Sequence, residues 1–121
     1  MPGRAPQGSP AQPLSPPVYH VLLALGGDVL HGYAIMLRFS ELSGGREELL
    51  PGSLYATLAR MVDGGLIEEA RAPRSEESEG PPRRHYRITP KGVAAAQAET
   101  ERMRRLVAVA RKRSWEPHPA R

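Results

Sequence analysis

Residues 53–60 combine side-chain types that suit contact with nucleic acid. We predict a helix over about residues 52–63, because Leu54, Leu58 and Met61 repeat at helical spacing and would face the interior. The opposite face carries no lysine or glutamate between Ser53 and Met61. It consists of Ser53, Ala56, Arg60 and Asp63, with Tyr55 and Thr57 on its flanks. Small hydroxyl and methyl groups can touch base edges in a DNA groove, while an arginine contacts guanine or phosphate. From this helix alone, packing against a partner subunit is an equal alternative.

A basic hairpin is predicted directly after this helix. Gly64 and Gly65 end the helix, and the segments GLIEEARA and RRHYRIT are expected to form the two strands of a wing over about residues 66–88. Alternation along the second strand places Tyr86 and Ile88 on one side and His85 and Arg87 on the other. The expected backbone or minor-groove contacts are Arg83, Arg84 and Arg87.

The tip of this hairpin is acidic, with Glu76, Glu77 and Glu79 between the basic stems. Carboxylates are repelled by phosphate, so we expect an ordinary solvated loop there.

Further helices are expected around these two elements. Residues 15–25 and 31–42 have helical apolar spacing, and Thr89 is expected to cap a last helix that runs to about residue 113. The predicted fold class is mainly α with a small β-hairpin wing, a winged helix-turn-helix plus a long C-terminal helix. The expected divisions are a disordered proline-rich arm (1–14), the winged helix-turn-helix domain (15–89), a dimerisation helix (90–113) and a frayed tail (114–121).

The last helix carries an apolar stripe with heptad spacing. Its members are separated by three, four, three, four and three residues, and we call them the heptad stripe: Val93, Ala96, Thr100, Met103, Val107 and Ala110. Such a stripe suits a dimer interface, although packing on its own domain is an alternative. At about 1.5 Å per residue the helix reaches roughly 35 Å, more than so small a domain covers, which favours a partner helix.

Catalysis and metal binding have no support in the sequence. There is no cysteine among the 121 residues, and the four histidines do not have metal-ligand spacing. No serine or acid pair has a base beside it, so we expect neither an enzyme nor a cofactor. No apolar run has membrane-spanning length and no hydrophobic leader is evident, so a cytoplasmic protein is expected. The net charge of +4 adds modest support for a nucleic-acid partner.

Three motifs resemble the PadR family of bacterial transcriptional regulators: HGYAI (31–35), PGSLY (51–55) and RITPKG (87–92). The resemblance covers about residues 14–113. It implies a homodimeric winged helix-turn-helix protein, usually a repressor, that binds a pseudo-palindromic operator in double-stranded DNA and in some members is released by a small hydrophobic effector. By this resemblance Ser53 and Tyr55 lie at the start of the recognition helix, and Arg60 matches a commonly basic position.

The chain departs from the family pattern in three ways. It has a single C-terminal helix, which indicates a short form, and its wing tip is acidic. Trp115 lies near the chain end rather than in mid-helix, so the resemblance does not extend to effector binding.

Two other functions compete with DNA binding. One is a winged-helix module that binds another protein without sequence-specific DNA binding, and the other is a ligand sensor with an apolar pocket between the first and last helices. Salt dependence separates DNA from protein partners, because DNA binding weakens steeply as phosphate counterions compete.

Overall fold

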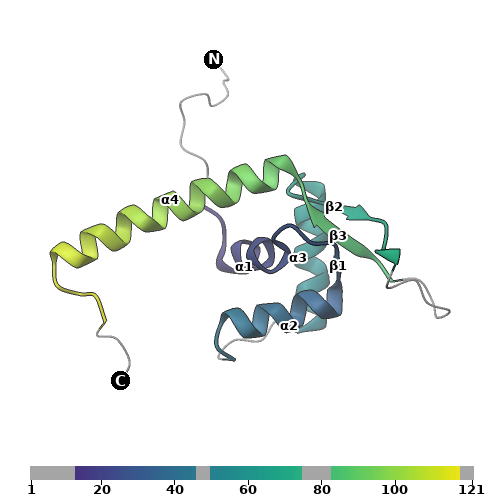
Figure 1. The fold of residues 1–121 in the computed structure, drawn as a ribbon, viewed down its shortest axis with the longest axis horizontal. Helices are drawn as coiled ribbons and strands as arrows, with labels where there is room; N and C mark the ends of the chain where they lie inside the picture. Colours follow the sequence, from purple (N-terminus) through teal and green to yellow (C-terminus); the bar gives the residue numbers. More distant parts are fainter. Residues whose placement is uncertain (1–12, 46–49, 75–82, 118–121) are drawn as a thin grey trace, which may run out of the picture.

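The computed structural model describes residues 13–45, 50–74 and 83–117 (Figure 1). Its elements in chain order are α1 (Pro16–Leu25), β1 (Leu30–His31), α2 (Gly32–Leu42), α3 (Pro51–Asp63), β2 (Ile67–Ala70), β3 (His85–Ile88) and α4 (Pro90–Lys112). This is the predicted order of a winged helix-turn-helix followed by a long helix. Most of the expected arm and the acidic wing tip lie outside the described residues.

The core forms where α1, α2 and α3 meet the sheet. Its most buried side chains are Val21, Leu22, Leu25, Ile35, Leu54, Leu58, Met61 and Ile67. Burial of this apolar surface is the main force that holds the three helices together. Arg38 adds a polar tie, because its guanidinium donates to the Ala24 carbonyl at 3.0 Å and to Asp28 at 2.8 Å. The end of α1 is thereby joined to α2. No helix in the described ranges is both long and apolar enough to cross a membrane.

The sheet has three strands, in the order β1-β3-β2, where the sequence predicted a two-stranded hairpin. Leu30 pairs with Tyr86 and His31 with His85 in the antiparallel register of β1 and β3. His31 was expected inside the second helix, but it caps α2 instead, since its Nδ1 accepts the Ala34 N–H at 3.2 Å. A two-residue strand is too short to leave a periodic signal in the sequence.

His85 is buried although it alternates with Tyr86, which is also buried. β3 is the central strand, so its first residues are covered by β1 as well as by β2. His85 donates from Nδ1 to the Arg83 carbonyl at 3.0 Å, and its ring meets His31 edge-on with centroids 5.4 Å apart. Arg87 is exposed, as predicted.

The start of α4 is fixed against the turn that follows α3. The Thr89 hydroxyl accepts the Gly92 N–H at 3.0 Å and lies 2.6 Å from the Gly65 carbonyl, to which it donates. A side chain at position 92 would collide with the backbone, because a Cβ there would lie 2.1 Å from the Leu66 carbonyl oxygen. Gly65 has a φ of 78°, the left-handed conformation that glycine adopts most easily. These contacts therefore fix the directions in which the wing and α4 extend from the turn after α3.

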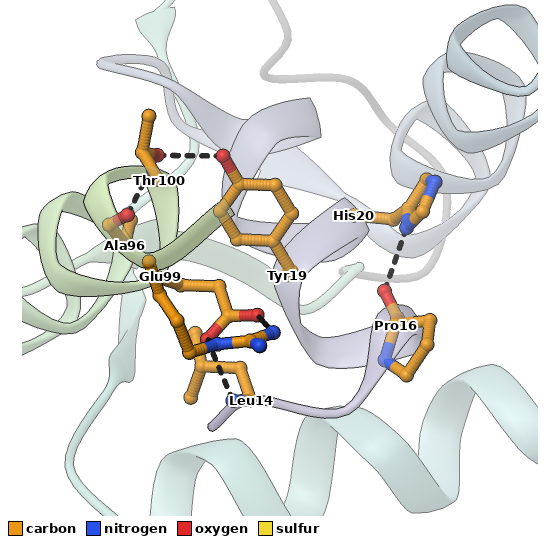
Figure 2. A network of polar contacts seen from close by, with 8 residues as sticks. Leu14, Pro16, Tyr19, His20, Ala96, Glu99 and Thr100 are labelled. Carbon is orange, nitrogen blue, oxygen red and sulfur yellow. Dashed lines mark hydrogen bonds and ion pairs between the residues drawn. The ribbon is translucent and has the colours of Figure 1, made fainter. Parts of the chain in front are cut away.

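α4 packs on α1 with its first half and continues beyond it (Figure 1). Near the start of α1, Tyr19 Oη lies 2.6 Å from Thr100 Oγ1 (Figure 2). Since Thr100 donates its own proton to the Ala96 carbonyl at 2.8 Å, Tyr19 is the donor in that contact. These bonds hold the first half of α4 on its own domain.

Glu99, which is 5% exposed, joins α4 to the N-terminal segment. Its carboxylate accepts the Leu14 N–H at 3.2 Å and pairs with Arg102 (Figure 2). The Arg102 guanidinium holds the pKa of Glu99 below its ordinary value, against the opposing effect of burial. Leu14, which the sequence placed in the disordered arm, packs against the core.

Replacement of Glu99 by glutamine is expected to destabilise the fold at neutral pH and not in acid. The folded-state pKa is depressed, so the ionised carboxylate stabilises the fold above its ordinary pKa, and this contribution disappears as pH falls through the folded-state value. Urea unfolding of both proteins across a pH series measures the difference.

Glu101→Gln is the matched control, because Glu101 lies on the same helix and pairs only with exposed arginines, at 3.3 Å and 3.5 Å. A destabilisation by Glu99→Gln that stays constant from neutral to acid pH would contradict the assigned role of the charge.

Candidate nucleic-acid interface

α3 buries one face and exposes another of the predicted kind. Pro51 starts the helix at a position where its missing N–H costs nothing, and Gly64 ends it. Leu54, Leu58 and Met61 are buried against the core, as predicted. The exposed residues between positions 52 and 60 are Gly52, Ser53, Tyr55, Ala56, Ala59 and Arg60.

Thr57 does not belong to the exposed face. It is 3% exposed, so the prediction that its hydroxyl faces a DNA groove is wrong. Position 57 is three residues after Leu54 and four before Met61, which places it at the edge of the buried sector. Its hydroxyl lies 3.4 Å from Arg60 Nη2, which donates to it. Thr57 thus helps to position the Arg60 side chain, which lies on the exposed face.

Tyr55 joins α3 to the start of α2. Its side chain is 51% exposed, yet the hydroxyl lies 2.8 Å from where a Cβ would stand at Gly32. A side chain at position 32 would displace the Tyr55 ring from this position. The HGY and SLY motifs therefore meet in space, a contact that the sequence analysis did not identify.

The wing arginines each have a neighbour within the sheet or its edge. Arg87 Nε donates to Glu68 at 2.6 Å, and Arg84 lies 3.9 Å from Glu69. Arg83 Nη1 lies 3.2 Å from His31 Nε2. Among these three arginines, Arg87 is therefore the most fully neutralised, by Glu68 on the neighbouring strand β2. Exposed pairs of this kind are weak and exchange readily with a phosphate.

A hollow of about 240 Å³ separates α3 from the wing. Tyr55 and Val62 line it on the side of the helix, and Glu69, Arg84 and Tyr86 line it on the side of the sheet. Burial raises the pKa of Tyr86, an effect that Arg84 partly offsets, so the phenol stays protonated at neutral pH. The helix and the wing thus form two separate exposed ridges rather than one flat surface.

The heptad stripe divides into two halves. Val93, Ala96 and Thr100 line an apolar groove of about 400 Å³ between α1 and α4, which we call the α1–α4 groove. Leu22, Leu23 and Gly26 form its other wall. Of the stripe residues beyond α1, Val107 is exposed, while Met103 and Ala110 are half-buried. The stripe therefore has one half beside α1, along the groove, and a projecting half beyond it.

The family model described as the transcriptional regulator PadR-like family matches residues 21–98. This chain belongs to the PadR-like family. Its members are transcriptional regulators and not enzymes, which confirms the expected absence of catalysis. In the ranges that the structure describes, no three histidine or acidic side chains are grouped as metal ligands.

Solved PadR structures share the fold. A PadR family regulator from Clostridium difficile superposes with a TM-score of 0.63 at 23% identity, covering 81% of this chain and 97% of that one. Bacillus subtilis PadR, solved in complex with operator DNA, gives a TM-score of 0.59 at 19% identity, covering 92% and 53% of the two chains.

A sequence relative is larger than this chain. An uncharacterised 37.1 kDa protein in transposon TN4556 of Streptomyces fradiae is 40% identical over 86 residues. The match covers 71% of this chain and 22% of that protein, so the chain spans about a fifth of the length of this relative.

Proposed function

We propose that this PadR-family regulator binds a pseudo-palindromic operator as a homodimer and represses transcription from it. The observation that carries this proposal is the division of α3 into a buried apolar face and an exposed face of small residues with one arginine. Ser53, Ala56 and Arg60 contact base edges in the major groove, and Tyr55 flanks them. Arg83, Arg84 and Arg87 contact the neighbouring phosphates or minor groove. The complex of Bacillus subtilis PadR with operator DNA supports the same kind of partner here.

The dimer is supported by the two halves of the heptad stripe. An antiparallel pair of α4 helices places the projecting half of each on the α1–α4 groove of the other, which buries both. A parallel pair would leave the groove open. It would also bring together two clusters of Arg104, Arg105, Arg111, Lys112 and Arg113. Electrostatic repulsion therefore favours the antiparallel pair.

Repression and release follow from this dimer. A dimer seated on an operator excludes other proteins from that DNA. Because the proposed target is DNA, the proposed place of action is the cytoplasm. A small hydrophobic effector that enters the α1–α4 groove would compete with the partner helix and change the spacing of the two α3 helices. Half-site spacing of about one turn, roughly 34 Å, makes DNA binding sensitive to such a change.

A protein-interaction module is the second candidate. The pairing of Glu68 with Arg87 and of Glu69 with Arg84 lowers the positive potential of the wing and favours this candidate. A protein partner would bind with little dependence on salt.

Arg60→Ala is expected to lower DNA affinity about ten-fold, because an arginine contact to a base contributes about 1–3 kcal/mol. Fluorescence anisotropy with labelled DNA from upstream of the gene, over a salt series, measures affinity and slope together. Wild-type binding should weaken with a log–log slope of about −0.9 for each phosphate contacted.

Thr57→Ser is the matched control on the same helix. It removes a buried methyl group, so the free energy of unfolding should fall by about 1 kcal/mol while DNA affinity stays unchanged. Salt-independent binding, or wild-type affinity in Arg60→Ala, would favour the interaction module instead.

Glu68→Gln is expected to strengthen DNA binding by up to about five-fold, because it frees Arg87 from an exposed pair whose contribution is up to about 1 kcal/mol. The slope of affinity against salt should steepen by about one phosphate contact. Glu116→Gln removes the same charge from beyond the end of α4, where Glu116 pairs with Arg111 and lies outside the wing, and should leave the slope unchanged. Equal effects of the two substitutions would show that net charge alone governs binding.

A further inference from the structure

Trp115 is exposed although the backbone around it is fixed. The Trp115 N–H donates to the Ala110 carbonyl and the Ser114 N–H to the Arg111 carbonyl, each at 2.9 Å. This pair of bonds is the Schellman motif, which requires a left-handed residue. Serine fills that position at a φ of 62°, a conformation that costs a non-glycine residue roughly 1–2 kcal/mol. The indole that follows is 70% exposed, with the Arg113 guanidinium 5.9 Å from its ring centre.

A hollow of about 190 Å³ on the other side of α1 offers an apolar floor for such a ring. It is lined by Leu23 and Ala24 of α1 and by Arg38, Glu41 and Leu42 of α2, and we call it the α1–α2 hollow. Leu23 also lines the α1–α4 groove, so it forms the ridge between the two depressions. Leu23 and Leu42 are each about half exposed, which is unfavourable for large apolar side chains in water.

The spacing of the heptad stripe brings the partner's Trp115 to this ridge. An antiparallel pair centred on the stripe sets Val93 opposite the partner's Ala110 and Thr100 opposite the partner's Met103. Trp115 follows Ala110 by five residues, the last three of them past the end of α4, and so lies beyond the partner residue that faces Ala110. Val93 lies across the groove from Leu23 and Gly26 at the end of α1. The partner's indole therefore arrives where the α1–α2 hollow begins.

The same indole cannot reach the hollow of its own chain. Val93 and Leu23 line the same groove, and α4 ends at Lys112, 19 positions after Val93 and roughly 28 Å away at helical rise. Charge also matches between the two chains. Trp115 is preceded by Lys112 and Arg113, whereas the rim of the hollow carries the Glu41 carboxylate. A cation near that rim gains from the carboxylate and from the end of the α2 helix.

We infer that each Trp115 docks in the α1–α2 hollow of the partner subunit, between Leu23 and Leu42, with Arg113 beside Glu41. This contact rests on the proposed dimer and extends its interface beyond the heptad stripe to α2. It links the end of α4 to the helix whose first residues, through Gly32, contact Tyr55 of α3.

Tryptophan fluorescence tests this contact directly, because Trp115 is the single tryptophan of the chain. Light scattering first gives the oligomeric state. In the native dimer the emission maximum should lie to the blue of that in denaturant, and acrylamide quenching should be several-fold weaker. Leu42→Ser should move the emission to the red while the dimer persists. Leu37→Ser is the matched control, since Leu37 is an equally exposed leucine of α2 that does not line the hollow.

A mixing experiment shows which chain supplies the hollow. The Leu42→Ser protein, which keeps Trp115, is exchanged with an excess of Trp115→Phe protein, whose hollow is native. Return of the blue-shifted emission supports docking on the partner, and emission that stays red overturns it. A native dimer with solvent-exposed Trp115 overturns this contact and leaves the proposed dimer standing. A monomeric native protein overturns both.

Discussion

The contact between the start of α4 and the turn after α3 determines the geometry on which the rest depends. Thr89 bonds to the Gly65 carbonyl, and Gly92 leaves no space between its backbone and the Leu66 carbonyl. The helix α3, the wing and α4 all diverge from this point. Because α4 cannot swing without breaking these contacts, a dimer built on α4 would hold its two α3 helices at one separation. A fixed separation is what a two-fold operator requires of its protein.

The arginines of α3 and of the wing differ in how far other side chains of the protein neutralise them. Arg60 lies on the exposed face of α3 and bonds to the neutral Thr57 hydroxyl, whereas Arg87 is paired with Glu68. Intramolecular pairing weakens the sequence-independent attraction of the wing for phosphate, because the pair must break before the arginine can bind. The positive charge that the wing presents to solvent is therefore lower than its arginines alone would give.

The sequence predicted the elements whose signals are local. Leu54, Leu58 and Met61 specify α3, and Thr89 followed by Pro90 and Gly92 marks the start of α4. Features that depend on distant segments were missed. In the sequence Glu99 resembles any solvated helix glutamate, because its contact with Leu14, 85 residues earlier in the chain, leaves no local signal. Thr57 lies at the boundary of the helical wheel, where tertiary packing decides burial, and the pairing of β1 with β3 joins segments more than 50 residues apart.

The central claim is that two α3 helices enter successive major grooves of one DNA duplex. The chain has no cysteine, so Ser53→Cys provides one attachment point for an iron chelate that cleaves nearby DNA by hydroxyl radicals. The account predicts two clusters of cuts from the chelate at Ser53→Cys, about one helical turn or roughly 34 Å apart. The same chelate attached at Ala108→Cys on α4 is the control and should cleave only weakly. The claim that α3 enters the major groove would be contradicted if the Ser53→Cys chelate cleaved no more strongly than the Ala108→Cys chelate while the protein remained bound to the DNA.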